Sequence, residues 1–396
     1  MRLVLITHPA RLGSASMPRF ATMIGKGMVK RGHEVEILRP QNRLSSVGRL
    51  SPSIRKWLGY VDDYVLFAWE LRRRRIAAEK ANRKELYIFC DQALGIFVPR
   101  LAGKAHVVHC HDFLAQRSAL GEFPENPTGW TGRQYQRMIR RGYRQGRHFI
   151  SISQATQFDL HRLLEEEPET SEVIYNGLNF PYQLLSQEIS LKELKALENG
   201  FEGEKFVLHV GGELWYKNRG GVLRIYAAYV EGQLSRGEKA VALWMVGPPA
   251  TDAMKNQVDE IHVKGGRVRF LQGLNNEQLC AAYNRALAFV FPSLEEGFGW
   301  PPLEALACGC PVLTTNKKPM TEVGGDLASY LERMPCTADE QKRWAFRGAQ
   351  ALEKLMTEDC SEKRSLRVAW ASRFGAETVL DGYERIYRSI WDREYL

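Results

Sequence analysis

The chain of 396 residues is longer than the about 100 to 200 residues of one ordinary domain, so we expect two domains. Its hydrophobic content of 44% and charged content of 26% are those of a soluble globular protein, and no run of about 18 uncharged apolar residues occurs, which argues against a membrane-spanning helix. The seven cysteines form no CxxC pairs, which argues against a zinc site and a disulfide framework.

The net charge of +9 is concentrated in the first half of the chain. Residues 1–180 contain 28 Lys and Arg against 17 Asp and Glu, a balance of +11, which leaves −2 for residues 181–396. The apolar stretch in MRLVLITHPARLG is too short for a signal peptide and is typical of a first strand. We therefore expect a cytoplasmic protein whose basic half could meet the inner face of the membrane.

Short β-rich runs alternate with helical patterns along both halves. The predicted strands of the first half are residues 2–7, 34–38, 86–90, 106–110, 148–153 and 172–175. Those of the second half are residues 206–211, 241–247, 267–273, 288–293 and 311–315. Strands separated by helices, and not by tight hairpin turns, indicate parallel βα units. The pattern therefore predicts an α/β protein with two doubly wound parallel sheets in series.

The end of the chain has a helical pattern of its own. Val379, Tyr383, Ile386 and Ile390 are spaced by four, three and four residues, which predicts a helix with one buried stripe. We expect domains at residues 1–190 and 191–372, joined near the charged segment 189–205, and a terminal helix at 373–396.

Two basic segments stand out in the first half. Arg72 to Arg75 follow an aromatic stretch within residues 54–75, and six arginines follow one another in a candidate helix. These six are Arg133, Arg137, Arg140, Arg141, Arg144 and Arg147. Such clusters can bind anionic lipid headgroups, although a solvated helix end is the more frequent interpretation of a charge run. Nonspecific nucleic-acid binding is a further alternative, but no recognition motif accompanies the arginines.

The stretch SLEEGFGWPPLEALACG, residues 293–309, carries two carboxylates around a glycine-proline turn. It follows a predicted strand, so it lies where open α/β sheets bind ligands. Gly297 and Gly299 let a ligand approach the backbone closely, and the helix predicted from Pro301 would direct its N-terminus at anionic groups. Glu296 and Glu304 could then accept short hydrogen bonds from the vicinal hydroxyls of a ribose or hexose.

Glu296 and Glu304, with seven residues between them, resemble the E-x7-E signature of the retaining GT-B glycosyltransferases, in particular glycosyltransferase family 4. Further segments resemble family elements in the same order: HVVHCHDFLA (106–115), ISISQATQFDL (150–160), VIYNGLN (173–179), VLHVGGELWYKNRGG (207–221) and PMTEVGGDLA (319–328). The resemblance covers nearly the whole chain. It implies two Rossmann-like domains facing a cleft, with the C-terminal helix crossing back to the N-domain.

The resemblance also implies roles for individual residues. Glu304 would hold the nucleotide ribose, and Glu296 with the backbone of Gly297, Phe298 and Gly299 would hold the transferred sugar. Lys217 would neutralise the leaving diphosphate next to Gly211 and Gly212. The remaining roles fall to the N-domain: Gly13 and Ser14 would leave room for the diphosphate, and His111 would contact the donor sugar, with Asp112 beside it at the acceptor. A structural histidine and a solvated lysine are the alternatives for His111 and Lys217.

Two family positions differ here. Gly212 and Tyr216 stand where the family usually has arginines, so Lys217 is the only cation that the phosphate motif itself supplies. We consider Arg219 a candidate replacement, without support from a motif. Asn179 replaces a common aspartate in an element that is largely structural.

The resemblance implies transfer of a hexose-type sugar from a UDP- or GDP-sugar to a hydroxyl of a glycan, glycolipid or lipid-linked acceptor, with retention of configuration. No D-x-D string occurs, so we expect no metal and no other cofactor. A nucleotide-sugar epimerase of the same fold is one alternative. An NAD-dependent dehydrogenase is another, but the loop THPARLGSASMP lacks the GxGxxG that it would require.

Overall fold

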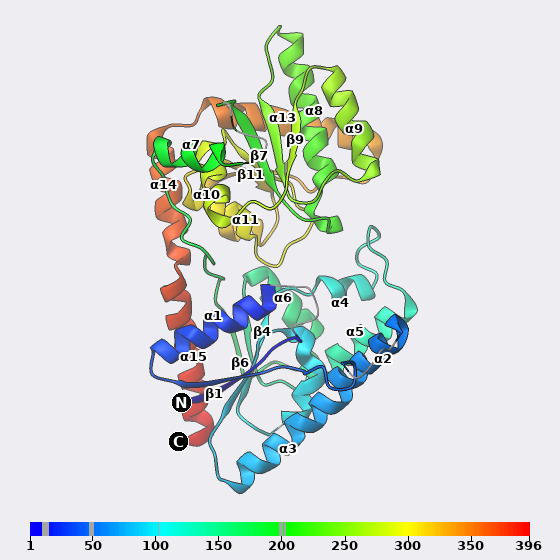
Figure 1. The fold of residues 1–396 in the computed structure, drawn as a ribbon, viewed down its shortest axis with the longest axis vertical. Coiled ribbons are helices and arrows are strands. Elements are labelled where there is room, and N and C mark those ends of the chain that lie inside the picture. Colours follow the sequence, from blue (N-terminus) through cyan, green and yellow to red (C-terminus); the bar gives the residue numbers. More distant parts are fainter. Residues whose placement is uncertain (10–15, 47–50, 102, 198–200, 202) are drawn as a thin grey trace. The chain divides into compact units, whose positions relative to one another are not determined.

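The computed structural model describes residues 1–9, 16–46, 51–101, 103–197, 201 and 203–396. The chain forms two compact units. Unit 1 comprises Met1–Tyr175 and Glu377–Leu396, and unit 2 comprises Asn176–Ala376 (Figure 1).

Unit 1 is built on a six-stranded parallel sheet in the order β2-β1-β3-β4-β5-β6. Its strands are β1 (Arg2–Ile6), β2 (Glu34–Leu38), β3 (Leu86–Phe89), β4 (His106–Cys110), β5 (His148–Ser151) and β6 (Thr170–Val173). The α-helices are α1 (Ser16–Lys30), α2 (Pro52–Val61), α3 (Phe67–Lys80), α4 (Leu114–Ala119), α5 (Trp130–Tyr143), α6 (Gln154–Leu163) and α15 (Ala376–Tyr395). A π-helical turn, η1 (Asp62–Leu66), joins α2 to α3, and the 3-10 segment η2 (Gln92–Leu101) follows β3.

Unit 2 contains the second parallel sheet, in the order β12-β11-β10-β7-β8-β9. Its strands are β7 (Phe206–Val210), β8 (Ala242–Val246), β9 (Val268–Leu271), β10 (Phe289–Phe291), β11 (Val312–Thr315) and β12 (Ala328–Leu331). Its α-helices are α7 (Gln187–Lys195), α8 (Arg219–Ser235), α9 (Asp252–Val263), α10 (Asn276–Arg285), α11 (Trp300–Ala307), α12 (Met320–Gly324), α13 (Ala338–Thr357) and α14 (Ser361–Ala371). The short 3-10 turns are η3 (Trp215–Lys217), η4 (Gly325–Leu327) and η5 (Ser372–Phe374).

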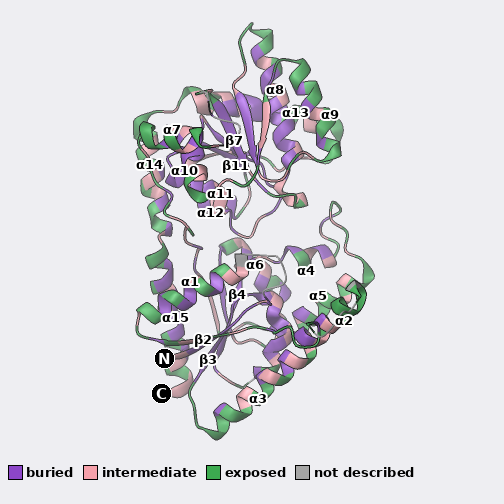
Figure 2. Ribbon diagram, viewed as in Figure 1, coloured by how far each residue is buried: buried purple, intermediate pink, exposed green. Residues whose placement is uncertain are grey.

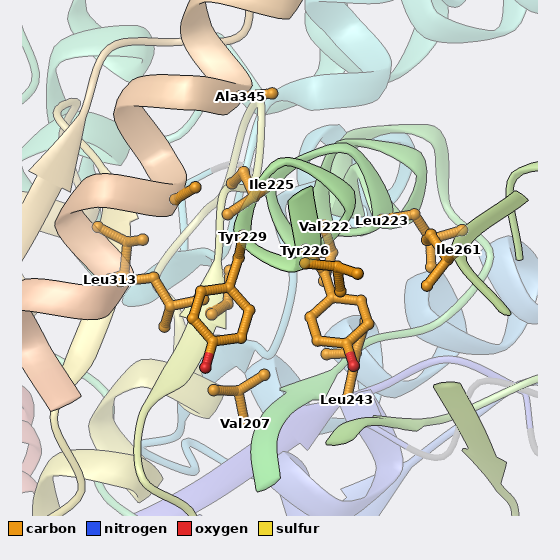
Figure 3. Close-up of a cluster of buried hydrophobic side chains, with 14 of the residues drawn as sticks. Val207, Val222, Leu223, Ile225, Tyr226, Tyr229, Leu243, Ile261, Leu313 and Ala345 are labelled. Atoms are coloured by element: carbon orange, nitrogen blue, oxygen red, sulfur yellow. The ribbon is translucent and has the colours of Figure 1, made fainter. Parts of the chain in front are cut away.

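The helices cover both faces of each sheet, so the inner strands are buried and the helices expose their outer faces (Figure 2). One core of unit 2 lies under α8 and α13, where Tyr226 and Tyr229 of α8 pack over Val207 and Leu243 of the strands (Figure 3). The phenol of Tyr226 donates a hydrogen bond of 2.8 Å to the carbonyl of Val241. The near-continuous apolar runs of the sequence are thus explained by strands that are buried on both faces.

The C-terminal helix α15 is part of unit 1, although the chain reaches it only after unit 2. Val379, Tyr383, Ile386 and Ile390 are buried in one core with residues of α1 and the sheet, which confirms the predicted stripe and the return of the helix to the N-terminal unit. Figure 1 shows α15, in red, beside α1.

The expected domain boundaries near 190 and 372 differ from the observed ones. Residues 176–190 belong to unit 2, because Asn284 of α10 binds the backbone there: its side chain accepts from Leu185 N–H at 2.9 Å and donates to the Gln183 carbonyl at 2.9 Å. At the other end, Phe374 packs near Phe298, with ring centroids 6.1 Å apart. The charged segment 189–205 was therefore a misleading sign of the junction, since its first part forms α7, which packs on α10.

Strand β12 was not predicted from the sequence. Its four residues, ASYL, are half-buried except for Leu331, because the strand lies at the edge of the sheet. A half-buried edge strand need not carry the continuous apolar run of a strand that is buried on both faces, and ASYL has only one large aliphatic residue.

Candidate active site

The loops that follow β7 and β10 meet in unit 2 and bring Lys217 to Glu296. Lys217 Nζ lies 2.8 Å from Glu296 Oε1, and the two side chains are only 16% and 8% exposed. The Ser293 hydroxyl lies 2.7 Å from the same carboxylate oxygen, and Leu294 N–H donates to the Tyr216 carbonyl at 2.8 Å. The ion pair therefore stands at the carboxyl ends of parallel strands, the edge at which open α/β sheets bind ligands.

Glu304 is a buried carboxylate on the short helix α11. It is 7% exposed, and the Tyr283 hydroxyl on α10 donates a hydrogen bond of 2.9 Å to its Oε2. Burial raises the pKa of Glu304 to about 7, while the hydrogen bond from Tyr283 and the positive charge of Lys217 act in the opposite direction. A hydrogen-bond donor supplied by a ligand would stabilise the ionised form.

Glycines shape the backbone around these carboxylates. Gly299 precedes α11 with a φ of +107°, a conformation that favours glycine, and a Cβ there would lie 2.3 Å from Met320 Cε. At Gly212 a Cβ would meet no described atom within 4 Å, so a ligand could approach the backbone there. Phe298 is 3% exposed, so its side chain belongs to the core and only its backbone could serve a ligand.

The N-terminus of α8 begins next to Lys217. Asn218 adopts φ +50° and caps the helix, since its Oδ1 accepts from Gly221 N–H at 3.2 Å and its Nδ2 donates to the Pro292 carbonyl at 2.8 Å. Arg219 is buried, and its guanidinium donates to the carbonyls of Pro249, at 3.2 Å, and Pro248. The proposed replacement of a family arginine by Arg219 therefore stays a prediction. To bind a phosphate, the guanidinium would have to give up its hydrogen bonds to these two carbonyls.

His209 is a buried residue beside the candidate site that the sequence did not reveal. It is fully buried, its Nδ1 lies 2.9 Å from the Val290 carbonyl, and its Nε2 has no hydrogen-bond partner among the described residues. Burial lowers the pKa of His209 to about 4. A Cβ at Gly211 would lie 2.7 Å from His209 Nε2, so this histidine is the reason why position 211 requires glycine. A histidine two residues before a glycine carries no motif, and only the packing identifies it.

The predicted residues of unit 1 lie in a different environment. His111 follows β4 and is 6% exposed; its Nε2 lies 2.9 Å from the Cys90 carbonyl, and its ring packs edge-on against Phe20 with centroids 4.4 Å apart. Burial lowers the pKa of His111, so the ring is neutral near pH 7. Asp112 accepts from Leu114 N–H at 3.1 Å and begins the turn into α4. Gly13 and Ser14 lie outside the described residues.

His111 and Asp112 line a pocket of about 260 Å³ whose described lining residues all belong to unit 1, and it is here called the unit 1 pocket. Its polar lining residues are Asp91, Gln92, His111, Asp112, Gln116 and Gln136. Asp91, at the end of β3, is paired with His8, whose Nε2 lies 2.9 Å from Asp91 Oδ2. The sequence predicted two of these residues, and nothing in its pattern marked the other four.

The two basic segments are less free than the sequence indicated. Arg74 binds Glu36 at 2.7 Å and Glu85 at 3.2 Å, and Arg75 lies 3.7 Å from Glu79, so only Arg72 and Arg73 of the four are exposed. The candidate arginine helix ends at Tyr143. Beyond its end, Arg144 pairs with Glu165, and Arg147 pairs with Glu394.

One group in the described part of the chain has the geometry of a possible metal site: His148, Glu169 and Glu394, whose ligand atoms lie within 4.8 Å of one another. Arg147 lies 2.7 Å from Glu394 and already balances that carboxylate. The expected absence of a metal from catalysis stays a prediction. None of the described helices combines the length and the apolar character that a bilayer span requires.

Two family profiles match the chain one after the other. The profile described as Glycosyltransferase Family 4 matches residues 17–180, and that of Glycosyl transferases group 1 matches residues 192–342. The chain belongs to glycosyltransferase family 4. The resemblance that the motifs suggested is thereby confirmed, and the order of strands and helices is that of the GT-B fold.

Curated relatives of this family 4 chain include the serotype-specific mannosyltransferase WbdA of Escherichia coli, 25% identical over 211 residues, which are 51% of this chain and 24% of WbdA. The O-antigen chain mannosyltransferase RfbU of Salmonella typhimurium is 24% identical over 210 residues, 52% of this chain and 51% of RfbU. N-acetyl-alpha-D-glucosaminyl L-malate synthase of Bacillus anthracis is 22% identical over 98% of this chain and 97% of its own. The matched region thus spans about a quarter of WbdA and about half of RfbU.

Solved structures of the same fold cover the whole family 4 chain. Anabaena Alr3699/HepE in complex with UDP and glucose has a TM-score of 0.62 and 18% identity, covering 98% of this chain and 100% of that one. WaaG, a glycosyltransferase involved in lipopolysaccharide biosynthesis, has a TM-score of 0.61 and 16% identity, covering 98% and 99%. At these identities the likeness shows the fold.

Proposed function

We propose that this protein transfers a hexose from a nucleoside diphosphate sugar to a hydroxyl of a glycan or lipid-linked acceptor. The observation that carries the proposal is the Lys217–Glu296 ion pair at the carboxyl ends of the unit 2 strands, next to the buried Glu304 of the E-x7-E motif. Family membership supports the reaction class.

Glu304 would bind the two vicinal hydroxyls of the nucleotide ribose. Its burial removes competing water, and Tyr283 holds one of its oxygens, which leaves lone pairs for hydroxyl donors. Each bond to an ionised carboxylate is worth roughly 1.5 to 3 kcal/mol, which is enough for this group to dominate donor affinity.

Lys217 would bind the diphosphate. In the free protein it is balanced by Glu296, so Lys217 itself is not an uncompensated buried cation before the donor arrives. When the glycosidic bond breaks, negative charge grows on the leaving diphosphate, and the lysine can follow that charge while Glu296 turns to the hydroxyls of the transferred sugar.

Retention of configuration and independence of metal ions complete the proposal, and both rest on the family resemblance. In this mechanism the acceptor oxygen bonds to the anomeric carbon on the face that the diphosphate leaves. The acceptor proton passes to a diphosphate oxygen. The chain therefore needs to supply charge stabilisation and positioning, and no general base of its own.

The relatives suggest which donor sugars to test first. WbdA and RfbU are described as mannosyltransferases, and HepE has been crystallised with UDP and glucose, so GDP-mannose and UDP-glucose are the first donors to test. The test measures nucleotide release from a panel of UDP- and GDP-sugars by the parent, by Glu304→Gln and by the control Glu277→Gln, an exposed glutamate on α10. Release that is lost in Glu304→Gln and retained in the control supports the proposal. Release of a sugar epimer without any acceptor would favour the epimerase instead.

We also propose that unit 1 contacts an anionic membrane through α2 and α5. The aromatic rings of Trp57, Tyr60, Tyr64 and Tyr135 form a continuous ladder between these helices, with centroids 5.9 to 6.1 Å apart. Trp57 and Trp130 are 72% and 73% exposed. Exposed cations accompany them on the same two helices: Arg55, Lys56, Arg133, Arg137 and Arg141. Exposed tryptophans among basic residues suit the interface of an anionic bilayer.

A further inference from the structure

Two residues that line the unit 1 pocket each have a buried polar atom without a hydrogen-bond partner among the described residues: His111 Nδ1 and Gln116 Oε1. The two residues are 6% and 3% exposed. Buried polar groups are nearly always paired in native proteins, so two such atoms beside one pocket indicate that a ligand or ordered water completes them.

Both atoms are hydrogen-bond acceptors. The Nε2 of His111 faces the Cys90 carbonyl at 2.9 Å and must carry the proton to make that bond, so Nδ1 of the neutral ring has a lone pair. The side-chain nitrogen of Gln116 donates to the Gln136 carbonyl at 2.9 Å and lies 2.7 Å from Gln136 Oε1, which identifies the open atom of Gln116 as its carbonyl oxygen. A ligand at either position must therefore donate a proton.

Asp91 adds a third set of acceptors to the same wall. One of its oxygens faces His8 Nε2 at 2.9 Å and the other accepts from Ala93 N–H at 2.8 Å, so each oxygen keeps a lone pair. Burial by itself would raise the pKa of Asp91, but the hydrogen bond and the charge of His8 hold it below its ordinary value. Among the described lining residues there is no Lys or Arg.

We propose that the unit 1 pocket binds the reacting end of the acceptor as an uncharged sugar, whose hydroxyls donate to Gln116, His111 and Asp91, and that it rejects a sugar bearing a phosphate at the same place. This rests on the proposed transferase function and names its acceptor class. Phosphate and carboxylate groups near pH 7 are chiefly acceptors, so they would face the lone pairs of His111 and Gln116 and the carboxylate of Asp91, whose charge His8 already balances. No described lining residue offers them a Lys or Arg. Sugar hydroxyls are uncharged and can donate hydrogen bonds to these acceptors.

The test uses matched pairs of small probes: methyl α-mannoside against mannose 6-phosphate, and methyl α-glucoside against glucose 6-phosphate. Dissociation constants are measured by ligand-observed NMR with the full chain. We expect at least one neutral glycoside to bind about tenfold more tightly than its phosphorylated counterpart. Equal or tighter binding of the phosphorylated sugars, or binding of neither neutral sugar, overturns the proposal.

Two variants assign the binding to this pocket. Gln116→Leu keeps the size of the side chain and removes the open acceptor, so the neutral glycoside should bind about three- to tenfold more weakly. Gln145→Leu, an exposed glutamine beyond the end of α5, is the matched control and should change nothing. Asp91→Asn should reduce the ratio between the dissociation constants of the phosphorylated and the neutral sugar, because it removes the carboxylate that the phosphate would face. An unchanged glycoside affinity in Gln116→Leu contradicts the assignment.

Nucleotide binding separates this inference from the proposed function. UDP and GDP titrations report on unit 2, so they should give the same affinities for the parent and for Gln116→Leu. If a nucleotide binds and the sugar preference is absent, only the acceptor inference fails. If neither nucleotide binds the folded parent, the proposed function fails.

Discussion

The two units present opposite chemistry at the places where ligands are expected. In unit 2, Lys217 balances Glu296 within a nearly buried ion pair beside Glu304. In the unit 1 pocket, the described lining residues carry carboxylates, amides and a neutral histidine without Lys or Arg. A diphosphate and a sugar hydroxyl make different demands, and each unit supplies the charge that suits one of them. The net charge of a unit is therefore a poor guide, because the more basic half of the sequence contains the less basic pocket.

Removal of the Glu304 carboxylate should be the most damaging change on the unit 2 side. Glu304→Ala loses two charge-assisted hydrogen bonds to the ribose, worth roughly 1.5 to 3 kcal/mol apiece, so donor affinity should fall more than about hundredfold. Calorimetric titration with the preferred nucleotide sugar measures it, and circular dichroism checks the fold. Near-parental affinity would show that unit 2 binds the donor by other groups.

The ion pair should matter more for turnover than for nucleotide binding. Lys217→Ala should lower kcat by about ten- to hundredfold, because the charge on the diphosphate grows only as the bond breaks. Glu296→Ala should lower kcat by a similar factor, because it loses the hydrogen bonds to the hydroxyls of the transferred sugar. Steady-state kinetics and the affinity for the nucleoside monophosphate are compared in each variant. A loss of nucleoside monophosphate affinity as large as the loss of kcat would contradict the assignment.

The raised pKa of Glu304 predicts a pH effect that is confined to unit 2. Because ribose hydroxyls favour the ionised carboxylate, donor affinity should fall below pH 7, by at most about tenfold per unit. The free energy of unfolding should change in the other direction: since the folded protein keeps this proton up to about pH 7, stability is lost as the pH rises from 4.5 to about 7. Glu304→Gln should remove both the pH dependence of donor affinity and this part of the pH dependence of the free energy of unfolding.

Tyr283→Phe is a milder form of the same test. Removing the phenol takes away a hydrogen bond that holds the pKa of Glu304 down, so the pH midpoint for donor binding should move upward. Donor affinity at pH 7 should fall about three- to tenfold. A parental midpoint would mean that Tyr283 only fills space.

The smallest effect is expected at the membrane surface of unit 1. Trp57→Ser combined with Trp130→Ser should reduce sedimentation with phosphatidylglycerol vesicles at low salt, where each nearby cation contributes about 1 kcal/mol. Phe158→Ser, at a residue of α6 that is 69% exposed, is the control. If the parent protein stays in the supernatant, the proposed membrane contact is wrong.

The site residues of the two units were not equally predictable. Glu296, Gly299 and Glu304 lie within one stretch of 17 residues, so a motif could reveal them. Tyr283, which holds Glu304, lies 21 residues away on another helix. In unit 1, Asp91 lies in the loop after β3 and Gln116 lies on α4. Local spacing carries no information about partners that only the packing of the sheet brings together.

By itself, the sequence determined both parallel sheets except for the edge strand β12, the buried stripe of α15 and the motif that carries the family. A strand buried on both faces requires a continuous apolar run, and a helix buried on one face imposes a period on its residues. The tertiary structure alone decided which charges are paired. It turned Arg74 inward to Glu36, placed Lys217 against Glu296, and left acceptors open at His111 and Gln116. Ion pairs and unmet hydrogen bonds depend on distances through space of a few ångströms, and the folded chain sets those distances between residues that are far apart along it.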